Sequence, residues 1–334
     1  MIKRLTVCAL AAILALFSAA AVAADVAPPG LTTVSLVITG QQGPVATIFY
    51  YGIEQGIFKK HGIDLKISAP TNASTTTDVV YVAKGQYDMG NVGGPASMLY
   101  KQKYGGDVVI FYGYIQNNVK CLVVGQNSGI NAVKDLKGKK VGFASNTPFA
   151  DMVAYLKSKG LGDSDYTLVP LSNAAVNSSY VSGKIDAALS FDVNIPIFND
   201  AGKQSKAFCE RDDGFNYQQV DIAATQSYIK AHRSIVANFA AALAETTESA
   251  KNHAGDAAGA VYRANPAQKP IGANVPVQQF AYVLKSYKTP NDAGHGYGWM
   301  SPKDWAETQY QAIKFFDLTP GLDFKSGWTN EFVH

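Results

Sequence analysis

The sequence predicts an α/β protein with two lobes, each a mainly parallel sheet flanked by helices, and a hinge between the lobes. Three observations lead to this prediction. Short β-type runs alternate with helix-type runs along most of the chain, which is the pattern of strands joined by crossover helices. The alternation restarts near the middle of the chain. Helix-type runs then dominate the final stretch, from about residue 227.

The first series of elements spans residues 33–114. Helical periodicity, with Ile48, Tyr51 and Phe58 available for one face, predicts a helix over 45–60 that stops at Gly62. The expected strands are 33–38, 63–67, 87–91 and 108–114, and a second helix is expected over 77–84.

The second series begins at the strand 121–124 and ends near residue 225. Its other expected elements are strands at 140–143, 166–170, 185–190 and 220–225, and helices at 147–159 and 174–182. Helices at 227–253, 277–285 and 302–316 complete the chain. We therefore expect lobe one at 31–118 plus 225–334 and lobe two at 119–224, with crossings near Asn117 and Ala224.

The N-terminus has the three parts of a secretory signal peptide, predicted over residues 1–23. Lys3 and Arg4 precede the apolar run Leu5–Val22, and Ala21-Val22-Ala23 supplies a small-residue cleavage site. A membrane anchor is the alternative, because about 18 apolar residues are nearly enough to span a bilayer. The cleavage site favours export, so the sequence predicts a soluble periplasmic protein.

Composition narrows the classes of partner. The chain is 47% hydrophobic and 16% charged, which is typical of a globular protein with a substantial core. Its formal net charge is +3, and loss of Lys3 and Arg4 with the leader brings it close to neutral. No basic block occurs, so nucleic acid is excluded as an expected partner.

Two cysteines, Cys121 and Cys209, remain after cleavage of the leader. In an oxidising compartment an even pair suggests a disulfide, and two buried free thiols are the alternative. The histidines are scattered, and no Cys/His cluster has the spacing of a zinc site. We expect no metal and no cofactor.

Six short segments, in order along nearly the whole mature chain, resemble the type II periplasmic solute-binding proteins. Within that class the resemblance is strongest to the sulfonate, nitrate and thiamine-pyrimidine-precursor binders. The segments are YGIEQGIFKKHGIDL at 51–65, KGQYDMG at 84–90, DLKGKKVG at 135–142, SGKIDAA at 182–188, LTPGL at 318–322 and WTNEF at 328–332. Their glycines and aspartates suit turns that direct strands, so the segments indicate the fold more than the ligand.

The resemblance implies a monomer that binds a small polar organic solute, such as a sulfonate or a taurine-like molecule, and delivers it to the permease of an ABC importer. A pyrimidine or aromatic-acid ligand is the alternative, and a signalling partner in place of a transporter is another. The fold also resembles the fungal thiamine-pyrimidine synthases, which use a cysteine-rich motif and a cofactor lysine. Because this chain has no cysteine cluster and a predicted leader, it is expected not to be an enzyme. Under the rival enzyme hypothesis, Asp192 or His295 would be the general acid or base.

The candidate ligand site follows from the rule that open α/β sheets bind ligands beyond the carboxyl ends of their strands. Helix starts after Gly94, Asn146 and Asn173 would offer N–H groups to an anionic oxygen, although such residues also serve as ordinary caps. The expected ligand-binding residues are Gln41, Gln42, Tyr51, Gly93, Gly94, Ser145, Asn146, Thr147, Asn173 and Asp192.

Asp192 is the only charged residue in this set. It lies in Phe191-Asp192-Val193-Asn194, where many relatives carry a Trp-Glu-Pro-like element. A carboxylate in a cleft can hold an amino or ring N–H group of a ligand, because buried charges are normally paired. With no Arg or Lys in the set, an anion would depend on helix ends and neutral donors.

Overall fold

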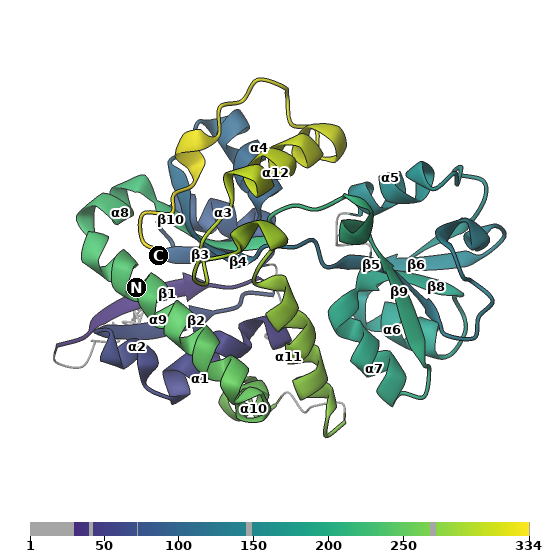
Figure 1. The fold of residues 1–334 in the computed structure, drawn as a ribbon, viewed down its shortest axis with the longest axis horizontal. Coiled ribbons are helices and arrows are strands. Elements are labelled where there is room, and N and C mark those ends of the chain that lie inside the picture. The colour runs from purple at the N-terminus through teal and green to yellow at the C-terminus, as the bar shows by residue number, and fades with distance from the viewer. Residues whose placement is uncertain (1–29, 40–42, 72, 145–148, 268–271, 334) are drawn as a thin grey trace, which may run out of the picture.

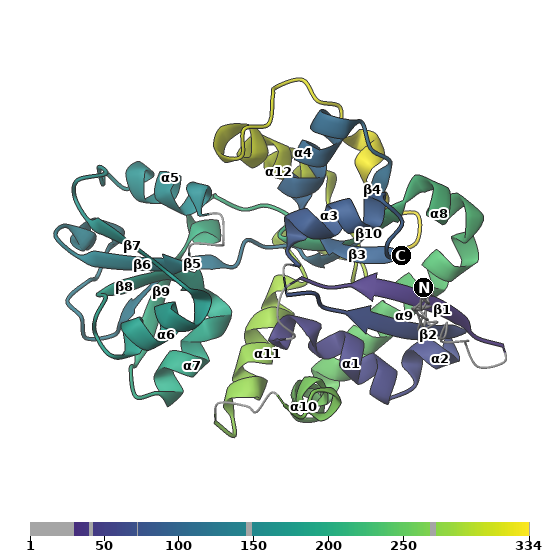
Figure 2. The ribbon, with the colours of Figure 1, turned by 180° about the vertical axis from the view of Figure 1, so that it is seen from behind.

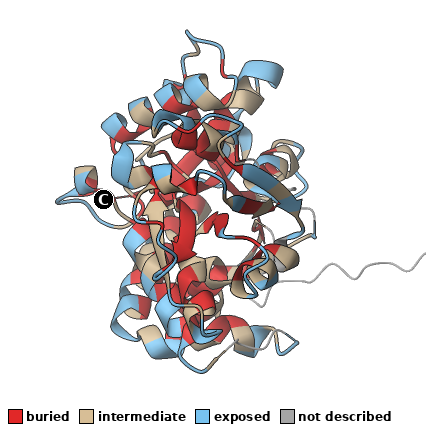
Figure 3. Ribbon diagram, turned by 90° about the vertical axis from the view of Figure 1, so that its right-hand side faces the viewer, coloured by how far each residue is buried: buried red, intermediate tan, exposed pale blue. Residues whose placement is uncertain are grey.

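The computed structural model describes residues 30–39, 43–71, 73–144, 149–267 and 272–333, so the predicted signal peptide lies outside it. Two α/β lobes lie next to each other (Figure 1), and each contains a five-stranded sheet. Buried residues are concentrated inside the lobes, and exposed residues cover the outer helices (Figure 3). These features confirm the predicted two-lobed α/β fold.

The first sheet has the strand order β2-β1-β3-β10-β4. Strand β1 runs parallel to β2 and β3, whereas β10 runs antiparallel to β3 and β4. The bounds are β1 Thr32–Val37, β2 Ile63–Ser68, β3 Met89–Val92, β4 Val108–Ile115 and β10 Val220–Thr225. The sheet is therefore mixed, and not mainly parallel as predicted, because the strand that returns from the second lobe runs against its neighbours.

Helices cover both faces of the first sheet, so its strands are almost wholly buried. One face packs against α1 Thr47–Glu54, α2 Ile57–Lys60, α9 Arg233–Asn252 and α10 Ala254–Ala264. The other packs against α3 Thr75–Ala83, α4 Gly94–Tyr104 and α12 Pro302–Phe315. The remaining helices of this part of the chain are η1 Pro44–Ala46, α8 Gln226–Ala231, α11 Val275–Ser286, η5 Pro290–Asp292 and η6 Lys325–Gly327.

The second sheet repeats the same arrangement with the order β7-β6-β8-β5-β9. Here β6 is parallel to β7 and β8, and β5 is antiparallel to β8 and β9. The strands are β5 Lys120–Gly125, β6 Lys140–Ala144, β7 Thr167–Leu171, β8 Ala187–Phe191 and β9 Ser205–Cys209. The helices are η2 Val133–Leu136, α5 Ala150–Ser158, α6 Asn173–Val181, η3 Asp192–Asn194, α7 Ile195–Asp200 and η4 Glu210–Asp213.

Two aspartates of the family-like segments hold equivalent positions in the two lobes. The Asp88 carboxylate accepts hydrogen bonds from the backbone N–H and the hydroxyl of Ser35 in β1. The Asp186 carboxylate accepts from the backbone N–H of Lys140 at the start of β6. Each aspartate therefore holds the second strand of its sheet in place, which is a structural role.

Two predicted helices are interrupted. The helix expected over 45–60 is split because Gly56 adopts a left-handed φ of 69°, which ends α1 before α2 begins. The helix expected over 227–253 breaks at His232, whose backbone is not helical (φ −126°, ψ 36°). Strand β9 and helices α7 and α10 have no counterpart among the predicted elements.

The chain crosses between the lobes twice, at residues 116–119 and 214–219 (Figure 2). Val220, the first residue of β10, pairs with Ile115 of β4, so β10 lies in the first sheet. The expected boundary at residue 224 instead assigns most of β10 to lobe two. Amide side chains join the two crossings: Asn216 Oδ1 accepts from the Asn118 N–H at 2.7 Å, and Gln218 donates to Gln116 at 3.2 Å.

Helices α11 and α12 extend from the first lobe to contact the second. Gln279 of α11 donates to the Val193 carbonyl at 3.0 Å, and Gln311 of α12 donates to the Gly214 carbonyl at 3.0 Å. Within the described residues, none of the helices has the length and apolar content that a bilayer-crossing segment requires.

Candidate ligand-binding site

The carboxyl edges of the two sheets face each other across the crossings. The first crossing leaves the end of β4 and enters the start of β5, and the second ends at the start of β10. Because β3 is antiparallel to β10, and β8 is antiparallel to β5, the ends of β3 and β8 lie at these same two edges. The site is therefore sought between the edge of lobe one at Gly93 and the edge of lobe two at Asp192.

Asp192 lies at the expected edge, directly after β8, and is buried. Arg211 lies two residues after the end of β9, at the same edge of the sheet. Its guanidinium is 2.7 Å from the Asp192 carboxylate and also donates to the Asn118 carbonyl. Burial raises the pKa of Asp192 above its usual range, and Arg211 opposes this rise without cancelling it. Asp192 therefore already has a charged partner within the protein, and its expected contact with a ligand remains a prediction.

The other charged residues at this edge are paired as well. The ammonium of Lys120, at the start of β5, contacts both carboxylate oxygens of Asp151 at 2.9 Å. Glu210 accepts a hydrogen bond from Asn118. Burial and the neighbouring Asp151 raise the pKa of Glu210, which favours its neutral form. The opposite charges of Asp192 and Arg211, and those of Lys120 and Asp151, therefore offset each other at this edge.

A row of phenylalanines lies beside these polar groups. Phe149 is between Phe143 and Phe191, with ring centroids 6.5 Å and 6.2 Å away, and the Lys120 ammonium lies 5.4 Å from its ring centre. Phe143 is the last residue but one of β6, Phe191 is the last residue of β8, and both are half-buried. Aromatic faces at strand ends can stack on a planar ligand.

On lobe one, the predicted donors Gly93 and Gly94 are buried at the start of α4, and their N–H groups are already used. Gly93 donates to the Thr75 carbonyl at 3.4 Å, and Gly94 donates to the Gln218 carbonyl at 3.1 Å. The side-chain oxygens of Gln218 and Gln219 are buried and have no hydrogen-bond partner among the described residues. The unpaired groups at this edge of lobe one are therefore the side-chain oxygens of Gln218 and Gln219, which accept hydrogen bonds. The sequence instead suggests the backbone N–H donors of Gly93 and Gly94.

The other predicted site residues are less informative. Tyr51 packs inside lobe one, and its hydroxyl lies 3.3 Å from that of Ser249 in α9, so the structure does not bring it to the edge. Asn173 begins α6 just beyond β7, as expected, but its side chain lies outside the described residues. So do Gln41, Gln42, Ser145, Asn146 and Thr147, whose ligand contacts remain predictions.

Sequence reasoning missed Arg211 and the three phenylalanines as site residues. Arg211 was missed because β9 was not predicted, so nothing marked residues 210–211 as a strand end. Phe143 and Phe191 carried a usable signal, since Phe143 ends one predicted strand and Phe191 directly follows another. His295, the rival acid or base, is exposed and stacks on Trp299 with a centroid distance of 3.6 Å.

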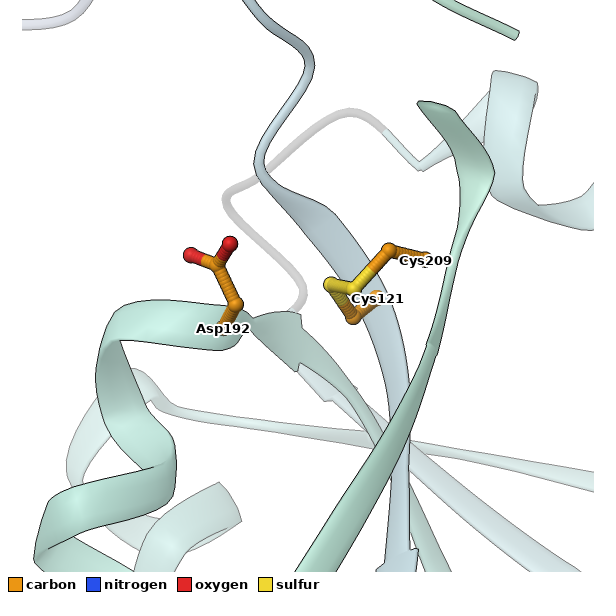
Figure 4. A group of neighbouring side chains, drawn as sticks. All are labelled: Cys121, Asp192 and Cys209. Atoms are coloured by element: carbon orange, nitrogen blue, oxygen red, sulfur yellow. A yellow bond between two sulfur atoms is a disulfide. The ribbon is translucent and has the colours of Figure 1, made fainter. Parts of the chain in front are cut away.

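One group in the described chain brings three possible metal ligands within 4.8 Å of one another: Cys121, Cys209 and Asp192 (Figure 4). The structure joins Cys121 and Cys209, which face each other on β5 and β9, in a disulfide. Metals bind the thiolate form of cysteine, so the disulfide sulfurs are not available as ligands. The group is therefore a disulfide bond next to the Asp192 carboxylate.

Two surface hollows lie away from this edge. One, of about 270 Å³, includes Lys134, Tyr155 and Phe208 in its walls, and the other, of about 580 Å³, includes Lys230 and Phe332. Neither contains a residue of the two crossings. We place the candidate site at the facing sheet edges because the strand ends of both lobes lie there, with the half-buried Phe143 and Phe191 rings on lobe two and the unpaired Gln218 and Gln219 side-chain oxygens beside lobe one.

A family model described as NMT1/THI5 like matches residues 43–257. The chain belongs to this family. Over 292 residues it is 22% identical to the formylaminopyrimidine-binding protein of Halalkalibacterium halodurans, covering 83% of this chain and 87% of that one. The periplasmic aliphatic sulphonate binding protein SsuA from Escherichia coli has the same fold, with a TM-score of 0.67, 16% identity, and coverage of 88% and 91%.

The expectation that the chain is not an enzyme is contradicted by a further relative. The 4-amino-5-hydroxymethyl-2-methylpyrimidine phosphate synthase of Schizosaccharomyces pombe is 26% identical over 138 residues. The match covers 41% of this chain and 39% of that enzyme. The family thus includes proteins named as enzymes, and a missing cysteine cluster was too narrow a ground for exclusion.

Proposed function

We propose that this family member is an exported solute-binding protein that takes an uncharged nitrogen heterocycle, of the aminopyrimidine class, into the cleft between its lobes and delivers it to an ABC importer. One observation carries the choice of ligand: the charged groups at the described edge of lobe two are already neutralised in pairs, next to a row of aromatic rings.

The charge balance disfavours a bare anion. A sulfonate or nitrate buried in the cleft would need a cation or several unpaired donors to replace its hydration. Lys120 is held by Asp151, Arg211 by Asp192, and the Gly93 and Gly94 donors are used. Residues 40–42 and 145–148, which the structure does not describe, include no charged residue.

The remaining features suit a flat ring with amino groups. Phe143 and Phe191 offer half-buried faces for stacking. The oxygens of Gln218 and Gln219 can accept hydrogen bonds from an amino group, and satisfying a buried acceptor is worth roughly 1–3 kcal/mol. The printed name of the Halalkalibacterium halodurans relative also concerns a pyrimidine. The predicted signal peptide supports a periplasmic location and a permease partner.

The test is calorimetric titration of the mature protein with 4-amino-5-hydroxymethyl-2-methylpyrimidine and formylaminopyrimidine, against taurine, an alkanesulfonate and nitrate. We expect a pyrimidine to bind at least tenfold more tightly than any anion. Phe191→Ala should weaken pyrimidine binding about tenfold through lost stacking. Phe208→Ala, which removes a half-buried ring of the same lobe away from the site, should leave affinity unchanged. Tighter binding of a sulfonate or nitrate would reject the proposed ligand class.

A further inference from the structure

Helix α11 belongs to lobe one but lies between the two lobes (Figure 1 and Figure 2). It contacts η1, the first helix after β1, and also η3, which directly follows β8. At the second contact, the Gln279 side chain donates to the Val193 carbonyl at 3.0 Å. Because η1 and η3 follow strands of different lobes, α11 borders the candidate site on one side.

The packing between α11 and lobe two is reciprocal. Tyr282 of α11 packs against the hydrophobic core of lobe two, whereas Val193 of η3 packs against the core of lobe one. Phe280 and Val283 of the same helix are buried in the core of lobe one. Tyr282 therefore reaches from lobe one to lobe two, at the place where Gln279 holds η3.

The Asp192–Arg211 ion pair lies beside this tyrosine. Asp192 directly precedes Val193 in η3, and its carboxylate is 2.7 Å from the Arg211 guanidinium. Burial raises the pKa of Tyr282, Asp192 adds to this rise, and Arg211 opposes it. The hydroxyl of Tyr282 therefore stays protonated at neutral pH, next to the edge of lobe two.

This hydroxyl is an unused hydrogen-bond donor. No hydrogen bond joins it to another described residue, and the side chain is only partly buried. The Lys285 ammonium lies 5.5 Å from the centre of the Tyr282 ring, a contact that involves the ring face and leaves the hydroxyl available. By contrast, the N–H groups of Gly93 and Gly94 and the guanidinium of Arg211 are engaged within the protein.

A pyrimidine needs such a donor. Its amino group donates hydrogen bonds, but each ring nitrogen has a lone pair that only accepts. Burying an acceptor without a donor is unfavourable. The unpaired oxygens of Gln218 and Gln219 can accept from the amino group but cannot donate to a ring nitrogen. The Tyr282 hydroxyl supplies the missing half of this recognition.

We propose that Tyr282 is a specificity-determining residue of the cleft, whose hydroxyl donates to a ring nitrogen of the bound heterocycle. It thereby selects a nitrogen heterocycle over a carbocycle of the same shape. This role rests on the proposed function, because it requires an aminopyrimidine-class ligand between the lobes. It also assigns recognition of the ring to a helix of lobe one, opposite the phenylalanines of lobe two.

Calorimetric titration of the mature protein with two ligands of the same shape tests this role. One is 4-amino-5-hydroxymethyl-2-methylpyrimidine, and the other is (2-amino-4-methylphenyl)methanol, in which CH groups replace both ring nitrogens. We expect the wild type to bind the pyrimidine about tenfold more tightly than the carbocycle, and Tyr282→Phe to lose this preference. The affinity of Tyr282→Phe for the carbocycle should stay within about twofold of the wild-type value, which also shows that the variant is folded.

Tyr310→Phe is the matched control. Tyr310 of α12 is 53% exposed, and the Lys314 ammonium lies 5.4 Å from its ring centre, so this variant removes a hydroxyl from a similar tyrosine–lysine contact and should keep the preference. An unchanged preference in Tyr282→Phe, or an equal loss of affinity for both ligands, would refute the role of Tyr282 and leave the proposed ligand class in place. Failure of the wild type to bind the pyrimidine would reject the proposed function and this inference with it.

Discussion

Arg211 and Asp192 form an ion pair at 2.7 Å across a strand that belongs to neither of them. Asp192 follows β8 and Arg211 follows β9, and β5 lies between these strands in the sheet. The pair therefore depends on the register of three strands, which the Cys121–Cys209 disulfide fixes on one side. This relationship makes the edge of lobe two a preformed surface.

Removing the carboxylate of this pair should destabilise the protein. In Asp192→Asn, Arg211 loses its main partner in a largely buried setting, and we expect a loss of about 2 kcal/mol in the free energy of unfolding. Adding Arg211→Gln should recover part of that loss. Urea denaturation measures both, with the exposed Glu54–Arg263 pair as control, where Glu54→Gln should cost less than about 0.5 kcal/mol. Equal effects of Asp192→Asn and Glu54→Gln would contradict the buried pairing.

The disulfide should be complete in protein isolated from an oxidising compartment. A thiol reagent under denaturing conditions should detect no free thiol, since Cys121 and Cys209 are the cysteines of the described chain. Because the bridge spans 88 residues, Cys121→Ser with Cys209→Ser should lower the free energy of unfolding by up to about 4–5 kcal/mol. Two reactive thiols per chain in the wild type would show that the bridge does not form.

Gly94 should tolerate no larger side chain. A Cβ at this position would lie 2.8 Å from Thr308 Cγ2 and 3.1 Å from the Gln218 backbone oxygen, so Gly94→Ala should lower the melting temperature by several degrees. Gly255→Ala is the matched control, because it is helical and exposed with open space around it, and it should be neutral or stabilising by up to about 1 kcal/mol. A harmless Gly94→Ala would mean that α4 does not pack against the second crossing as described.

Asp78 should make stability depend on pH in the neutral range. Burial raises its pKa from 3.8 to about 7, and the neighbouring Ser74 and Thr77 oppose this rise only in part. Because the pKa of Asp78 is higher in the folded than in the unfolded protein, loss of its proton favours unfolding. The free energy of unfolding should therefore fall as the pH rises from about 4 to about 7, by at most roughly 4 kcal/mol. Melting curves from pH 5 to 8 should therefore flatten in Asp78→Asn, while exposed Asp107→Asn should leave the slope unchanged. A slope shared by all three proteins would exclude Asp78 as its source.

The lobes should move relative to each other when ligand binds. Small-angle scattering should give a smaller radius of gyration at saturation, because two crossings joined by amide hydrogen bonds form a hinge. Gln279→Ala, which removes the contact of α11 with Val193, should change the ligand-free radius, whereas exposed Gln278→Ala should not. A radius unaffected by saturating ligand would indicate a rigid cleft.

Local patterns accounted for much of the fold. Alternating or continuous apolar runs identified nine of the ten strands within a few residues, and eight of these nine contain buried residues, with β7 the exception. Strand β9 was missed because its SKAFC sequence is polar at the start and only half-buried. Its absence hid Arg211, so an error in one edge strand became an error in the site.

The rest of the site depends on partners far away in the sequence. Nothing local to Gly93 and Gly94 indicates that Thr75 and Gln218 accept their N–H groups. Tyr51 shares a helix with residues near the sheet edge, and only the packing of α9 shows that its ring points into the core. Periodicity predicts which face of a helix is buried, but not what it is buried against.

The second lobe leaves β4 and returns to β10 at one place, and the disulfide joins its first strand to its last. The second lobe is thus an insertion in the chain of the first lobe. The segments that enter and leave it are joined by hydrogen bonds, and the disulfide links its first and last strands. Insertions with neighbouring ends leave the host chain's geometry undisturbed. Evolution can therefore exchange this half of the cleft as a module, and alter what such proteins recognise, without redesigning the half that carries it.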